Sequence, residues 1–232
     1  MATISENLQV VRGRIARAAQ AGRRAADSVT LLAVSKTHPP ARIAEARAAG
    51  QRAFGENYVQ EALEKMDVLP GLEWHLIGPL QSNKTRLAAE RFDWVHTLDR
   101  EKIAKRLSEQ RPAGLPPLNV LLQVNVSGEA SKSGLAPQDV LALAEAVRRL
   151  PRLRLRGLMA IPEPSSDPAA QRARFRAARE IFESMGPGLD TLSMGMSEDM
   201  EAAIAEGASL VDPEGGTPIR WAPGRGWTAD DA

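Results

Sequence analysis

The feature of this sequence that most constrains its fold is a regular alternation of short apolar runs with longer helical stretches. The apolar runs are candidate strands, and the stretches between most of them are rich in Ala, Glu and Arg. Such an alternation predicts a parallel sheet whose strands are joined by helical crossovers. The candidate strands are residues 30–35, 52–57, 73–78, 94–98, 118–126, 155–161, 191–195 and 208–211.

Eight such units in 232 residues predict a single (β/α)8 TIM barrel domain over residues 1–232. A doubly wound open sheet is the main alternative. Its dinucleotide-binding version is weakened because no G-x-G-x-x-G follows the first strand. One extra helix is expected ahead of the first strand, with Ser5 as its cap and Leu8, Val11 and Ile15 on one face.

The composition narrows the classes of function. The chain has no cysteine, and its three histidines show no ligand spacing, so we expect no metal site. A formal net charge of +1 gives no global electrostatic case for binding nucleic acid. The basic cluster at 148–156 is expected to be a solvated helix end and strand entry, with an RNA or protein contact as the alternative. No signal peptide or membrane span is recognisable, which favours a cytoplasmic protein.

Polar side chains follow several of the candidate strands, and in a barrel the carboxyl ends of all strands meet at one mouth. Lys36 ends the first strand, Asn57 ends the second and Asn125 ends the fifth. A lysine amine that loses hydration there is more easily neutral, and a neutral amine condenses with an aldehyde. The alternative is a lysine whose ammonium group reaches solvent from the strand end.

The segment Ser193–Ser197 joins the seventh strand to a helix, and Ser197 is expected to be the N-cap of that helix. A glycine-containing turn that enters a helix offers backbone N–H groups to an anion such as phosphate. An ordinary capped helix is the alternative. A lysine after the first strand and phosphate donors after the seventh would together suit pyridoxal phosphate, an aldehyde that carries a phosphate.

Long blocks of the chain resemble one family in order. They are LLAVSKTHP (31–39), FGENYVQE (54–61), WHLIGPLQSNK (74–84), VNVSGEASKSGL (124–135), RGLMAIP (156–162) and LSMGMSEDMEAAIAEGA (192–208). The sequence thereby resembles the pyridoxal phosphate homeostasis protein family, also called the YggS/PROSC family. The resemblance implies a barrel similar to the N-terminal domain of alanine racemase, with Lys36 holding pyridoxal 5′-phosphate (PLP) as a Schiff base.

The resemblance also implies a role in intracellular PLP and amino-acid homeostasis without established turnover. The implied partners are PLP itself, PLP-dependent apoenzymes or free amino acids, and the implied state is a monomer. His75 is expected either to contact the cofactor or to be satisfied inside the barrel, and Asn57 either to bond a ring substituent or to cap a turn. The expected cofactor-binding residues are Lys36, Asn57, His75, Met194, Ser197, Gly216 and Thr217.

Residues 212–232 form an atypical C-terminal tail. The family's eighth strand usually reads V-R-I-G-T-A-I-F-G, whereas this chain has Asp212 in the place of the arginine. Gly216 and Thr217 are candidates for the phosphate-binding Gly-Thr pair after an insertion. Because Pro213 and Pro218 interrupt the segment, we expect no regular closing strand beyond Val211.

Three functions other than a non-catalytic carrier stay open. A PLP-dependent racemase-like enzyme is the first alternative, although a racemase needs acid/base groups on both faces of the ring. Alanine racemase takes one such tyrosine from an additional domain, and the only tyrosine here is Tyr58. A barrel aldolase, in which Lys36 reacts directly with a sugar or keto acid, is the second, and the RNA or protein contact through 148–156 is the third.

Overall fold

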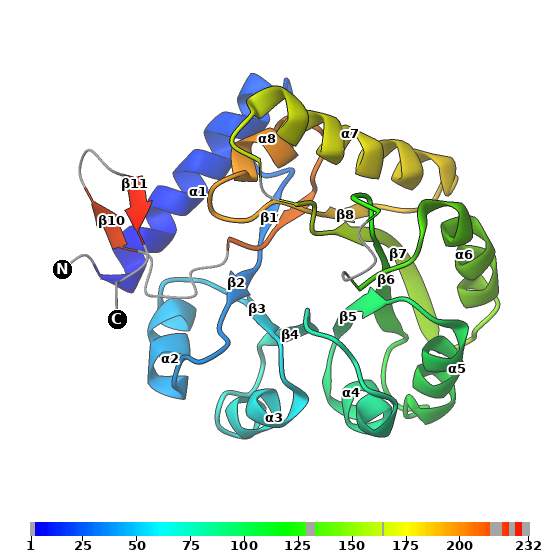
Figure 1. The fold of residues 1–232 in the computed structure, drawn as a ribbon. Helices are drawn as coiled ribbons and strands as arrows, with labels where there is room; N and C mark the ends of the chain where they lie inside the picture. Colours follow the sequence, from blue (N-terminus) through cyan, green and yellow to red (C-terminus); the bar gives the residue numbers. More distant parts are fainter. Residues whose placement is uncertain (1–2, 129–132, 164, 214–219, 223–225, 229–232) are drawn as a thin grey trace.

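The computed structural model describes residues 3–128, 133–163, 165–213, 220–222 and 226–228. In this part of the chain, short parallel strands form a barrel that is surrounded by helices (Figure 1). The strands are β1 (Thr30–Leu31), β2 (Ala33–Val34), β3 (Ala53–Glu56), β4 (Glu73–Leu76), β5 (Trp94–Leu98), β6 (Leu118–Val124), β7 (Leu153–Ala160), β8 (Thr191–Ser193) and β9 (Leu210–Val211). The α-helices are α1 (Ile4–Ala21), α2 (Pro40–Ala48), α3 (Val59–Val68), α4 (Thr85–Arg91), α5 (Glu101–Gln110), α6 (Val140–Arg148), α7 (Pro168–Ser184) and α8 (Met200–Ala205).

The first predicted strand closes the barrel because its two halves pair with different neighbours. β1 pairs with β9, and β2 pairs with β3. The sheet order is β1-β9-β8-β7-β6-β5-β4-β3-β2, so the same segment stands at both ends of the sheet. Between the halves, the Leu32 N–H donates to the Val211 carbonyl oxygen at 2.9 Å. The predicted (β/α)8 barrel is therefore confirmed, as is the extra helix ahead of its first strand.

The barrel sheet carries hydrophobic side chains on both faces, one inside the barrel and one against the helices. Leu32 between β1 and β2, Ala53 of β3 and Ile77 just after β4 pack together with Leu210 of β9 in a small inner cluster. Phe54 and Leu76, which alternate with the inward residues, belong instead to the large core shared with the helices. This period of two places alternate side chains of each strand on opposite faces of the sheet.

The extra helix α1 begins with a capping box built on Thr3. The Glu6 N–H donates to Thr3 Oγ1, and the Thr3 N–H donates to Glu6 Oε2. The prediction that Ser5 caps this helix was wrong, because Thr3 has a carboxylate three residues later to complete the box and Ser5 lies in the first turn. The buried face of α1 carries Val11 and Ile15 and packs against α2 and α8.

The chain leaves the barrel as soon as β9 ends. β9 has two residues, and Asp212 N–H donates to the Gly195 carbonyl oxygen before Pro213 interrupts the strand. Beyond it, β10 (Arg220–Ala222) and β11 (Gly226–Thr228) form a separate antiparallel pair. The expected absence of a regular extension past Val211 in the barrel sheet agrees with the described residues, whereas Gly216 and Thr217 lie outside them.

Candidate functional site

Lys36 lies in the turn that directly follows β2, and its side chain is half-buried. The Ser35 N–H donates to the Gly55 carbonyl oxygen, which extends the pairing with β3 by one residue. Thr37 then takes a φ of +63°, and α2 begins at Pro40. Leu32 belongs to the inner cluster and Val34 packs against it, so alternation continued past β2 predicts that Lys36 faces the inside of the barrel at its carboxyl end. Pro39 is the N-cap of α2 and Pro40 is its first residue, where proline costs no hydrogen bond.

A second lysine, Lys65 of α3, binds the backbone immediately before Lys36. Its Nζ lies 2.6 Å from the Ser35 carbonyl oxygen, 2.6 Å from Glu56 Oε1 and 2.7 Å from Glu61 Oε1. The Lys65 residue is 3 % exposed and Glu56 is 0 % exposed. We call Glu56, Glu61 and Lys65 the lysine cluster; it lies between β3 and α3, behind the turn that carries Lys36.

The same cluster binds the backbone immediately after Lys36. The Thr37 N–H donates to Glu61 Oε1 at 2.6 Å, and the Ser35 hydroxyl donates to Glu56 Oε1 at 2.5 Å. Burial raises the pKa of the Glu56 carboxyl, although its bonds to Lys65 and Ser35 oppose that shift. The other carboxyl oxygen, Glu56 Oε2, has no hydrogen-bond partner among the described residues.

Nothing in the sequence analysis singled out the lysine cluster, although one signal was present. Lys65 lies four residues after Glu61, a spacing typical of an ion pair on a helix. It also falls on the face of α3 that carries the buried Ala62 and Met66. A charged residue at an apolar position of an amphipathic helix indicates a buried partner, which here is Glu56 on the neighbouring strand.

Asn57 follows β3 and is half-buried beside Gly78, the residue expected to close the third strand. A Cβ on Gly78 would lie 2.1 Å from the Asn57 carbonyl oxygen, so only glycine permits this approach of the two loops. The Gly78 carbonyl oxygen in turn accepts a hydrogen bond from Thr97 Oγ1 at 2.8 Å. Asn57 is thereby held at the mouth, and its contact with the cofactor stays a prediction.

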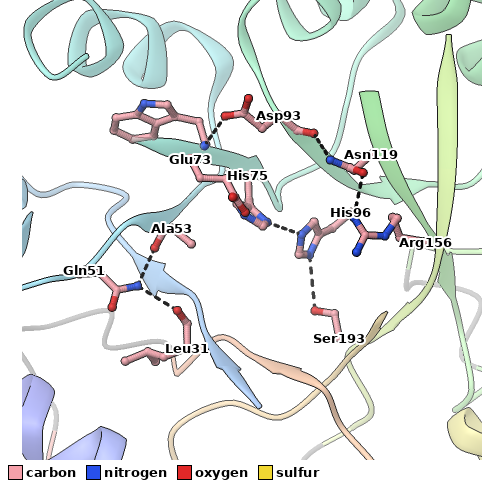
Figure 2. Close-up of polar contacts among 11 residues, drawn as sticks. Leu31, Gln51, Ala53, Glu73, His75, Asp93, His96, Asn119, Arg156 and Ser193 are labelled. Atoms are coloured by element: carbon pink, nitrogen blue, oxygen red, sulfur yellow. Dashed lines mark hydrogen bonds and ion pairs between the residues drawn. The ribbon is translucent and has the colours of Figure 1, made fainter. Parts of the chain in front are cut away.

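His75 lies inside the barrel, where protein groups occupy both of its ring nitrogens (Figure 2). Nδ1 lies 2.9 Å from Nε2 of His96, and Nε2 lies 2.8 Å from Oε1 of Glu73. The His75 ring also stacks on Trp94, with centroids 5.1 Å apart and an angle of 8° between the planes. These contacts favour the alternative of a histidine satisfied inside the barrel, and direct binding of the cofactor by His75 stays a prediction.

The two histidines form a neutral, directed chain of hydrogen bonds. Burial lowers the pKa of His75 and lowers that of His96 well below its usual value, so neither carries a charge at neutral pH. Each neutral ring has one N–H. If His75 donates to the Glu73 carboxylate, it accepts from His96, and His96 Nδ1 accepts from the Ser193 hydroxyl at 3.4 Å. We call His75 and His96 the histidine pair.

The turn after β8 differs from the predicted one. α8 begins at Met200 with Asp199 as its N-cap, so the prediction of Ser197 as N-cap was wrong. The Asp199 carboxylate reaches back to the Met196 N–H at 2.6 Å, which closes a turn ahead of the helix. Gly195 has a φ of +98°, and a Cβ on it would lie 2.5 Å from the Ala203 Cβ. The Met194 side chain points away from the mouth into the outer core, where it is 1 % exposed.

The extra helix α1 fastens this turn. Arg14 donates to the Ser197 carbonyl oxygen at 3.1 Å and to both carboxyl oxygens of Glu201, at 2.7 and 2.9 Å. A guanidinium group with two parallel bonds to a carboxylate is a rigid contact. The sequence analysis predicted α1 but assigned it no part in the site. Its role here is to hold the backbone of the loop after β8.

The basic cluster at 148–156 lies at the expected boundary, since α6 ends at Arg148 and β7 begins at Leu153. Arg148 and Arg152 donate to backbone carbonyl oxygens. Arg156 pairs with Asp190 at 2.7 Å and lies 4.7 Å above the Trp94 ring. Three of the five arginines in this cluster therefore bind other groups of the protein, through hydrogen bonds, an ion pair or a contact with an aromatic ring.

The described residues fit PLP at its aldehyde end, because a lysine amine stands at the barrel mouth on a turn held from both sides. At the phosphate end, the Met196 amide already binds a carboxylate, so it is suited to an anion. Within the described ranges, no group of three or more His, Cys, Asp or Glu side chains is placed to hold a metal ion. No helix in the same ranges is long and apolar enough to cross a membrane.

Comparison with known proteins gives one consistent result. A sequence model of the family described as alanine racemase, N-terminal domain, matches residues 7–213. The pyridoxal phosphate homeostasis protein of Pseudomonas aeruginosa is 66 % identical over 213 residues, which cover 91 % of this chain and 93 % of that protein. The protein of the same name from Escherichia coli K12 is 55 % identical over 222 residues and has 94 % of its length covered, with 91 % of this chain.

Solved structures agree with the sequence comparison. PipY of Synechococcus elongatus, in a structure with PLP bound, has a TM-score of 0.74 and 41 % identity, covering 86 % of this chain and 97 % of that one. Alanine racemase from Corynebacterium glutamicum has a TM-score of 0.64 at 18 % identity, covering 87 % of this chain and 59 % of that one. The second similarity shows the barrel fold alone.

Proposed function

Because this chain belongs to the family of pyridoxal phosphate homeostasis proteins, we propose that it binds PLP through a Schiff base on Lys36 and acts in PLP and amino-acid homeostasis. PLP supplies an aldehyde that condenses reversibly with amines. The observation that carries the proposal is the position of Lys36: it is a half-buried amine at the barrel mouth, on a turn whose backbone is bound on both sides.

Each end of the cofactor has suitable groups in this chain. Lys36 takes the aldehyde, and Asn57 lies at the same mouth for a ring substituent. The Gly195–Ser197 turn offers backbone donors for the phosphate, once the hydrogen bond from the Met196 amide to the Asp199 carboxylate is broken. Gly216 and Thr217 remain proposed phosphate donors on the resemblance alone.

We infer a carrier rather than an enzyme. A racemase requires an acid/base group on each face of the cofactor. Tyr58, the only tyrosine of the chain, is 63 % exposed, and both ring nitrogens of His75 are engaged inside the barrel. Relatives named for homeostasis support the same conclusion. We further propose a cytoplasmic monomer that passes PLP to apoenzymes or free amino acids.

The proposal is tested by fixing the cofactor in place. The protein is incubated with PLP, reduced with borohydride and digested, and the modified lysine is located by mass spectrometry. We expect the modification on Lys36 and its loss in Lys36→Ala. Lys84→Ala is the matched control, because Lys84 also follows a barrel strand and its amine donates to Gln60 Oε1 at 2.9 Å on the exposed surface.

Three results would contradict the proposal. Equal labelling of the wild type and Lys36→Ala would assign the attachment to another lysine. The aldolase would be favoured if PLP did not label the wild type and borohydride instead linked a sugar or keto acid covalently to Lys36. Racemisation of an L-amino acid by the PLP-loaded protein would instead favour the racemase-like alternative.

A further inference from the structure

We propose that the lysine cluster is a positioning device for Lys36, with Lys65 as its central residue. This inference rests on the proposed function, because it assigns the cluster a role in presenting the Lys36 amine to the aldehyde of PLP. Lys65 does not touch the cofactor in this proposal. It acts through the two peptide groups that flank Lys36.

The geometry of the cluster follows the turn from one side of Lys36 to the other. Lys65 Nζ binds the carbonyl oxygen of Ser35, and Glu61, itself bonded to Lys65, binds the N–H of Thr37. The two contacts therefore fix the peptide before Lys36 and the peptide after it. The positive φ of Thr37 is an unfavourable conformation for a β-branched residue, so the turn needs such external support.

The charge of the cluster is difficult to explain by stability alone. Replacement of a buried ion pair by apolar residues of similar volume is often neutral or stabilising, because burial removes both charges from water. Here one buried lysine meets two carboxylates, and Glu56 still leaves one oxygen without a partner among the described residues. A charged cluster does offer what apolar packing cannot, namely strong directional bonds to the polar backbone groups beside Lys36.

The test compares two ligands that differ at the aldehyde. Pyridoxine 5′-phosphate carries an alcohol in its place, so it uses the ring and phosphate contacts but cannot react with Lys36. For the double variant Lys65→Met/Glu56→Gln, which removes both buried charges together, we expect PLP to bind about tenfold more weakly. Pyridoxine 5′-phosphate should bind the variant and the wild type within about twofold of each other. Glu61→Gln should show a smaller effect of the same kind, and Glu64→Gln, on the exposed face of α3, is its matched control.

A second measurement keeps the inference testable without PLP. In the unliganded full-length protein, the rate of reductive methylation of Lys36 is followed by mass spectrometry. We expect this rate to change in Lys65→Met/Glu56→Gln and in Glu61→Gln, and to match the wild type in Glu64→Gln. Hydrogen exchange of the Thr37 amide should become faster in the first two variants, because its acceptor is weakened or displaced.

The possible outcomes are distinct. Equal weakening of both ligands would show that the cluster supports the fold in general, and unchanged PLP binding would show that it does not position Lys36; either result overturns the inference. Unchanged Lys36 methylation in the variants overturns it even if the wild-type protein fails to bind PLP. Failure of the proposed function, in contrast, is recognised by wild-type protein whose PLP binding does not depend on Lys36.

Discussion

Two buried polar clusters lie close to β3 and β4, and they are built on opposite electrostatic principles. The lysine cluster, outside the barrel wall, is charged and binds backbone groups of the Lys36 turn. The histidine pair, inside the barrel, is neutral and links Glu73 to Ser193 through ring nitrogens (Figure 2). The difference indicates that charge is used where a backbone must be held in place, whereas neutral rings fill and rigidify the interior.

The two clusters also differ in how burial acts on their titration. Burial raises the pKa of Glu56 and lowers the pKa of His75 and His96. In all three cases burial favours the neutral form, which is protonated for a carboxyl group and unprotonated for imidazole. Lowering the pH therefore favours the folded state through Glu56 and disfavours it through the two histidines. The dependence of unfolding free energy on pH can thus distinguish the two clusters.

The largest expected effect is that of removing the charge of Lys65 alone. Lys65→Met leaves Glu56 buried without its cation, and breaking a buried pair in this way costs about 3–5 kcal/mol of unfolding free energy. Urea denaturation measures the loss. The double variant Lys65→Met/Glu56→Gln should recover at least part of it, and a single variant as stable as the wild type would contradict the assignment of a charged cluster.

A smaller loss is expected when the histidine pair is broken. His96→Leu introduces an apolar side chain of similar size and removes the partner of His75 Nδ1. One buried group left unsatisfied costs about 1–3 kcal/mol. The same denaturation experiment checks the value. PLP binding should change far less than in the lysine-cluster variants, and an equal loss of PLP binding in His96→Leu would remove the functional distinction between the clusters.

The smallest effect is the dependence of stability on pH. The folded histidines bind a proton less readily than the unfolded chain, so unfolding takes up protons as pH falls below about 6.5 and the unfolding free energy decreases. Each proton contributes at most about 1.4 kcal/mol per pH unit. Glu73, Asp93 and Ser193 are the other groups near the pair.

Denaturation at pH 7.5 and 5.5 measures this dependence, and His96→Leu should reduce it. Glu56 acts in the opposite direction: its raised pKa gives a stabilisation that is complete below about pH 4.5 and is lost as pH rises through the folded value. Glu56→Gln should therefore remove this opposing contribution, so that in a series extended down to pH 4.5 the unfolding free energy falls more steeply in the variant than in the wild type. A pH profile unchanged in both variants would show that other groups control it.

Much of the fold and part of the site could be predicted. The eight strand positions, the helices between them and the location of Lys36 at a strand end all follow from local periodicity and from motifs. The predictions that failed concern the caps of two helices, because Thr3 and Asp199 competed with Ser5 and Ser197 for the same role within a few residues. Local patterns locate a helix more reliably than they locate its first residue.

By itself, the sequence determined the alternation of strands and helices and the family, and it singled out the lysine that we propose meets the cofactor. Only the tertiary structure decided what surrounds that lysine. Lys65 reaches Ser35 across thirty residues, and His96 reaches Ser193 across ninety-seven. The physical reason is that the register of neighbouring strands in the closed barrel sets such contacts, and no local periodicity in the chain specifies which buried charges or ring nitrogens will meet.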